Sequence, residues 1–124
     1  MSSVERVGLR SIYDSRGHPT VEATVTARSG VVGRAASPSG ASTGVHEVRA
    51  FPEGGVPETL TRFGERERAS LAGTPLGDQP EWDRRLHDID GTPDLSRLGG
   101  NTTTALSLAY SLAGAAEAKQ PLWS

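Results

Sequence analysis

Apolar and polar residues alternate strictly along one segment of the first third of the chain. From Thr20 to Ala27, valine and alanine occupy every second position, and threonine or glutamate fills the positions between them. A period of two residues is typical of a strand with one buried face. Similar patterns run from Val4 to Ser11 and from Val31 to Ala36, separated by the turn-rich segments 14–19 and 28–30. The pattern predicts a three-stranded antiparallel meander.

The last two thirds of the chain favour helices. Segment 57–71 predicts one helix, which Gly73 and Pro75 would end. Segment 79–90 predicts a second, with apolar residues at i, i+4 and i+7: Trp82, Leu86 and Ile89. Strands followed by helices predict an α+β fold, in which a helical layer covers one face of a small antiparallel sheet. We expect residues 1–124 to form one domain.

The segment from Asn101 to Gln120 has the strongest helical pattern. We expect Asn101 to cap this helix, because asparagine is a preferred N-cap residue. Its buried face is expected to consist of a stripe of small and apolar residues and their neighbours, namely Ala105, Leu106, Leu108, Ala109, Leu112, Ala113 and Ala116. Small side chains on that face would let another element approach closely.

Composition and charge exclude several classes of function. The net charge of −2 creates no field that would attract nucleic acid or an anionic membrane. The chain has no cysteine, so disulfides and thiol catalysis are excluded. No run of 18 apolar residues occurs, and the first ten residues lack the apolar core of a signal peptide. We expect a cytoplasmic protein with no nucleic-acid or membrane partner.

The segment from Gly40 to Gly44, Gly40-Ala41-Ser42-Thr43-Gly44, fits the nucleophile-elbow pattern G-x-S-x-G. That motif requires a strand running into the serine and a helix directly after it, yet Pro38 and Pro52 interrupt both. The hydroxyls also suit a phosphate or a hard cation, although the nucleotide P-loop pattern is absent. The residues alone leave a hydrolase, an anion or cation loop and a plain surface loop open, and the plain loop is favoured.

Three acidic or basic side chains near the end of the second predicted helix raise the question of a metal. His87, Asp88 and Asp90 do not have the spacing of a strong metal site. We interpret them as a solvated helix end, and we interpret Trp82 as a core residue.

Four segments read together carry a resemblance to a known family. They are "SIYDSRGHPTVEATV", "PSGASTGVHE", "DIDGT" and "LGGNTTTALSLAYSLAGAAEAKQPLW", and they span most of the chain in order. The chain resembles the N-terminal domain of enolase (phosphopyruvate hydratase). The resemblance implies a three-stranded meander with several helices, which precedes an α/β barrel and takes part in an oligomer.

The resemblance also implies a role for the small-residue loop. In enolases such a loop closes over the barrel mouth, so Gly40, Ala41, Ser42, Thr43 and Gly44 would form a substrate-covering lid. Ser42 would supply oxygen to the second Mg²⁺, and His46 would approach the substrate. Two Mg²⁺ ions suit a reaction that builds negative charge on an enediolate. The implied reaction is the dehydration of 2-phosphoglycerate to phosphoenolpyruvate.

The remaining catalytic groups of enolases belong to the barrel, which would begin where this sequence stops at Ser124. We therefore expect no catalytic residue within the chain, no activity from the chain alone and a barrel polypeptide as its partner. His18 replaces the family's asparagine, and segment 48–55 departs from the family pattern. These changes leave open a paralogue that acts on another phospho- or phosphono-carboxylate, and a non-catalytic interaction module is a further alternative.

Overall fold

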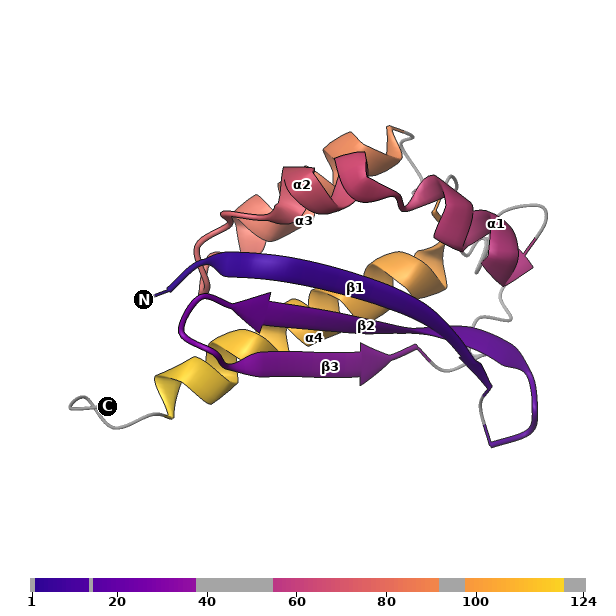
Figure 1. Cartoon of the computed structure of the whole chain (residues 1–124), viewed down its shortest axis with the longest axis horizontal. Coiled ribbons are helices and arrows are strands. Elements are labelled where there is room, and N and C mark those ends of the chain that lie inside the picture. Colours follow the sequence, from indigo (N-terminus) through magenta and orange to yellow (C-terminus); the bar gives the residue numbers. More distant parts are fainter. Residues whose placement is uncertain (1, 14, 38–54, 92–97, 120–124) are drawn as a thin grey trace.

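The computed structural model describes residues 2–13, 15–37, 55–91 and 98–119. Its sheet contains β1 (Val4–Tyr13), β2 (Pro19–Ala27) and β3 (Val32–Ala36), in the order β1-β2-β3 with β2 at the centre (Figure 1). Both pairings are antiparallel. The predicted meander is therefore confirmed.

The two faces of the sheet follow the alternation in β2. Val21, Ala23 and Val25 are fully buried on the inner face. On the outer face, the Glu22 carboxylate lies 2.8 Å from Nε of Arg10 on β1 and 3.7 Å from Nε of Arg34 on β3. Period two thus separates an apolar inner face from an outer face that carries paired charges.

Four helices follow the sheet within the described ranges, and the prediction of one helix over segment 57–71 is wrong. The structure has α1 (Gly55–Arg62), α2 (Glu65–Leu71), α3 (Gln79–Asp90) and α4 (Gly100–Ala118). Between α1 and α2, the Phe63 ring is fully buried, and Gly64 starts a new helix, its N–H donating to Glu67 Oε1 at 2.9 Å. Burial of the ring and a second N-terminal cap together account for the interruption.

Helix α3 agrees closely with its prediction. Asp78 caps its N-terminus by accepting from the Glu81 N–H, and Gly91 ends it with a left-handed backbone at φ 75°. Trp82 is fully buried and stacks on Tyr110 of α4, with ring centroids 4.5 Å apart. The expectation that Trp82 is a core residue is confirmed.

Helix α4 crosses behind β2 and β3 and covers the inner face of the sheet (Figure 1). At the crossing, Gly33 of β3 lies against the helix backbone. A Cβ atom at Gly33 would lie 2.0 Å from the carbonyl oxygen of Ala109 and 2.4 Å from the N atom of Ala113. The expectation that small residues permit close packing is confirmed, and the sheet contributes the smallest residue of all.

Two details of the α4 prediction are wrong. The N-cap is Gly99, and Asn101 lies buried inside the first turn. Leu108 and Leu112, expected in the core, are 45% and 48% exposed. The buried face is rotated toward Tyr110, because the helix packs against α3 as well as against the sheet. The buried residues of α4 are Asn101, Thr102, Thr103, Ala105, Leu106, Ala109, Tyr110 and Ala113.

Candidate functional site

The predicted lid and metal residues, Gly40, Ala41, Ser42, Thr43, Gly44 and His46, lie outside the described residues. Their roles therefore stay predictions. The structure does describe the residues on both sides of segment 38–54. Those flanking residues form the framework from which a loop would extend.

The N-terminal flank is held to the centre of the sheet. Ser37, directly after β3, is buried, and its carbonyl oxygen accepts a hydrogen bond of 2.6 Å from the Thr20 hydroxyl. The Ser37 N–H donates to the Val21 carbonyl oxygen at 3.3 Å. The chain is thus fixed to β2 one residue past the end of β3.

The C-terminal flank is held by a second buried threonine. Gly55 begins α1, and the Thr59 hydroxyl lies 3.4 Å from the Gly55 carbonyl oxygen and 3.3 Å from the Leu98 carbonyl oxygen. The Leu98 N–H in turn donates to Asp90 Oδ2 at 2.7 Å. Since Asp90 ends α3 and Leu98 lies just before α4, this network connects three helices beside the point where segment 38–54 rejoins the fold.

Sequence reasoning did not single out these positioning residues. Thr20 belongs to the polar half of an alternating strand, a position that usually faces solvent, and Thr59 lies in an ordinary helical segment. Asp90 was assigned to a solvated helix end, which is wrong, because it is buried and bonded to the Leu98 N–H. The periodicity of apolar residues does not identify a buried polar side chain whose hydrogen-bond partner is distant in sequence.

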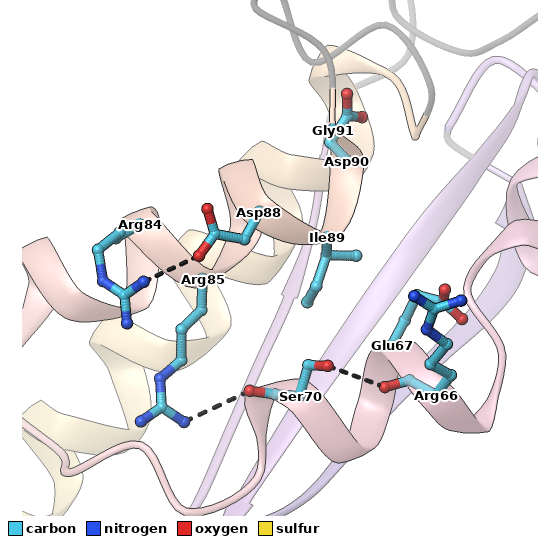
Figure 2. A pocket seen from close by; sticks show the side chains of 9 residues that line it. All are labelled: Arg66, Glu67, Ser70, Arg84, Arg85, Asp88, Ile89, Asp90 and Gly91. Carbon is cyan, nitrogen blue, oxygen red and sulfur yellow. Dashed lines mark hydrogen bonds and ion pairs between the residues drawn. The ribbon is translucent and has the colours of Figure 1, made fainter.

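A cleft of about 530 Å³ lies between α2 and α3 and carries several arginines (Figure 2). Arg84 contacts both Glu81 and Asp88 at 2.8 Å, and Arg85 contacts Glu81 at 2.9 Å. Figure 2 shows Arg85 reaching across toward the Ser70 carbonyl oxygen on α2. The charges of Arg84 and Arg85 are thus paired with Glu81 and Asp88 within α3.

Electrostatics around Glu81 agree with this interpretation. Hydrogen bonds from Arg84 and then Arg85 lower the pKa of the Glu81 carboxyl from 4.5 to about 2. The same pairing raises the pKa of Arg84. Both groups are therefore charged and paired at neutral pH.

The described part of the chain does not present a metal centre. Among those residues no three histidine or acidic side chains gather closely enough to hold an ion. Asp88 pairs with Arg84, and Asp90 accepts from Leu98. Any Mg²⁺ site would therefore need ligands from the predicted lid or from another segment or chain.

None of the helices in the described ranges is long and apolar enough to cross a membrane.

A family model described as "Enolase, N-terminal domain" matches residues 4–124. An enolase from Methanosphaera stadtmanae is 47% identical to this chain, and one from Methanothermobacter thermautotrophicus is 48% identical, each over 122 residues. Each alignment covers 98% of this chain but only 29% of the relative.

Proposed function

Because the chain belongs to the enolase N-terminal domain family, we propose that it is the capping domain of an enolase-type hydro-lyase. The observation that carries the proposal is the match along almost the whole chain to less than a third of each relative. We assign residues 1–124 to this single domain. The barrel would lie on another polypeptide or on a further segment, and the assembly would be a cytoplasmic oligomer.

In this proposal the chain contributes a loop to an active site that the barrel completes. Gly40 to Gly44 would cover the substrate, Ser42 would offer an oxygen to Mg²⁺, and His46 would lie near the substrate. Bound Mg²⁺ would stabilise the negative charge that develops when a proton is removed beside a carboxylate. The buried bonds at Ser37 and Thr59 support the proposal, because they fix both flanks of a loop that must be positioned accurately.

The proposal assigns the proton-removing base and the other metal ligands to the barrel. Lys119, the only lysine of the chain, follows the end of α4. A lone lysine with no carboxylate cluster among the described residues is poorly suited to this chemistry. We therefore expect the isolated chain to be inactive.

A reconstitution assay tests the proposal. The purified chain is mixed with Mg²⁺, 2-phosphoglycerate and the Methanothermobacter enolase from which the matched N-terminal part has been removed, and enol phosphate is followed by ultraviolet absorbance. We expect no turnover from either piece alone and measurable turnover from the mixture. Ser42→Ala should lower that rate at least about tenfold, since the active site loses an oxygen ligand.

Two controls make the assay decisive. The relative's own N-terminal piece, added in place of this chain, establishes that the barrel piece is competent. Ser11→Ala, which changes an exposed serine on β1, should leave the rate unchanged. Turnover by the isolated chain, or none with a competent barrel, would contradict the proposal.

The altered residues His18 and segment 48–55 favour one second candidate, a paralogue that acts on another phospho- or phosphono-carboxylate. Binding to the barrel without turnover of 2-phosphoglycerate would support it. The same mixture would then be tested with phosphonate analogues of the substrate.

A further inference from the structure

The cleft between α2 and α3 is large enough to hold a small organic molecule. Its volume of about 530 Å³ falls within the usual range of ligand pockets. Arg66 and Ser70 line it from α2, and Arg85 and Ile89 line it from α3. Because Arg66 and Ser70 are exposed, the cleft is open to a ligand in solution.

The two arginines of α3 differ in how fully their donors are used. Arg84 donates from all three of its side-chain nitrogens to carboxylates of its own helix, at 2.8–2.9 Å. Arg85 donates from Nε to Glu81 at 2.9 Å, but its Nη1 lies 3.4 Å from each of two carbonyl oxygens, at the outer limit of a hydrogen bond. Within the described ranges its Nη2 has no partner. Arg85 therefore retains donors for a ligand.

Arg66 presents a second guanidinium group from the opposite wall. Among the described residues, its side chain forms no ion pair or hydrogen bond. Figure 2 shows Ser70 between the side chains of Arg66 and Arg85, with Ile89 pointing into the space between the two helices. Ile89 is partly buried and packs against the core. The cleft thus combines two guanidinium groups that have unused donors with an apolar side chain between them.

The carboxylates of the cleft already have partners in the fold. Glu67 accepts from the backbone N–H that starts α2 at 2.9 Å, and Asp88 pairs with Arg84 at 2.8 Å. Asp90 is buried and accepts from the Leu98 N–H at 2.7 Å. In the described part of the chain, no three acidic or histidine side chains gather closely enough to hold a metal ion. The unused groups are therefore better suited to a ligand that accepts hydrogen bonds than to a cation.

We propose that the α2–α3 cleft binds a small organic dianion, whose two carboxylate or phosphate groups contact Arg66 and Arg85 while its carbon chain lies over Ile89. The planar fork of an arginine side chain matches the oxygens of either anionic group. A ligand of this kind would add a connection between α2 and α3 to the long contacts from Arg85 Nη1. A monoanion reaches only one of the two arginines and should bind more weakly. The inference does not rest on the proposed function, because it uses only residues of α2 and α3.

A nuclear magnetic resonance titration of the full chain tests the proposal. The probes are glutarate, a dicarboxylate, and 3-phosphoglycerate, which carries one carboxylate and one phosphate, with butyrate as the monoanion at matched ionic strength. We expect saturating shifts of backbone amide signals centred on α2 and α3, and binding of butyrate at least about fivefold weaker, since one charged contact is missing. Saturation with either dianion supports the proposal, and the tighter of the two identifies the preferred anionic group.

Arg66→Gln is the decisive variant, because it removes a guanidinium group without breaking a bond within the described ranges. It should weaken binding of the dianion by about fivefold or more. Arg34→Gln is the matched control, since it removes a 62% exposed arginine from β3, and it should bind like the wild type. Circular dichroism melts show whether each variant is folded. Should Arg66→Gln unfold, Arg66→Lys, which keeps the charge but loses the planar fork, is tested in its place and should also weaken binding.

Three results would overturn the proposal. The first is a set of shifts that grow without saturation or centre on another surface of the domain. The second is equal affinity for butyrate and for both dianions. The third is binding that the Arg66 variant leaves unchanged or that Arg34→Gln weakens equally, because the cleft would then not be what recognises the anion.

Discussion

Two contacts between elements of this domain are built in opposite ways. Where β3 meets α4, a glycine lies against the helix backbone and small side chains fill the interface. Where α2 meets α3, Arg85 of α3 pairs with Glu81 of its own helix and reaches across an open cleft to the carbonyl oxygens of Ser70 and Ala72. The first contact depends on shape, whereas the second depends on charges that retain access to water.

The difference indicates how much each contact tolerates change. A close-packed contact between two backbones cannot move aside, so an added atom is costly. Exposed ion pairs are screened by water and salt, and each contributes little. Substitutions should therefore produce large effects at β3–α4 and small ones at α2–α3.

The largest effect is expected from Gly33→Ala. The new Cβ would overlap the Ala109 carbonyl oxygen and the Ala113 N atom, both of which belong to the helix backbone. The sheet and α4 must separate, and we expect a loss of about 3 kcal/mol or more in the free energy of unfolding. Urea denaturation followed by circular dichroism measures it.

Gly8→Ala is the matched control for that variant. Gly8 lies in the same sheet on β1, and a Cβ there would meet its nearest atom, Thr24 Cβ, at 4.0 Å. We expect little change or a slight gain in stability. Equal losses at the two glycines would show that close packing is not what distinguishes the α4 contact.

An intermediate effect is expected from Tyr110→Phe, which keeps the stack on Trp82 but removes the hydroxyl. That hydroxyl accepts from the Asp78 N–H at 2.7 Å and donates to the Pro75 carbonyl oxygen. Losing both bonds should cost about 1–2 kcal/mol at neutral pH. Comparing the urea midpoints of the two proteins measures the loss.

The same variant has a pH signature. Burial raises the pKa of Tyr110 above its ordinary value of 10, so the folded state favours the neutral phenol. The stabilisation is complete below pH 10 and is lost as the pH rises through the folded-state value. The wild type should therefore lose more stability than Tyr110→Phe above pH 10, and identical alkaline profiles would contradict a buried hydroxyl.

The smallest effect is expected from Glu81→Gln in the α2–α3 contact. Because the pKa of Glu81 is lowered to about 2, its contribution is present above pH 4.5 and is lost as the pH falls toward 2. We expect a slight decrease in melting temperature at neutral pH, which should disappear at pH 2 and shrink in high salt. Asp88→Asn, which alters a 67% exposed partner of Arg84, should have no measurable effect.

Local patterns predicted most of the fold. Alternation in β2 identified the sheet, and the spacing of Trp82, Leu86 and Ile89 identified α3. The pattern did not predict helix boundaries that tertiary contacts determine. An example is Phe63, whose burial interrupts a continuous helical segment. The pattern was also insufficient for Leu108 and Leu112, because a small rotation of α4 toward Tyr110 moves both out of the core.

For the candidate site too, the sequence predicted one part and not the other. The loop motif around Ser42 was identified from its resemblance to a family, and its place in space stays a prediction. Its framework could not be foreseen, because Thr20, Thr59 and Asp90 act through bonds to residues distant in sequence. A sequence shows which residues make up a motif. It does not show which distant carbonyl oxygen or N–H forms the hydrogen bonds that hold the residues on either side of that motif.

The covering of the sheet by α4 has a consequence for how the domain is made. The strands are complete by residue 36, but the helix that buries the inner face of β2 and β3 begins only at Gly100. During synthesis on the ribosome, the valines of β2 therefore stay accessible to solvent until α4 has emerged. The meander is a local structure, but its stability is acquired late, so a chaperone or a slow codon would act most effectively in that interval.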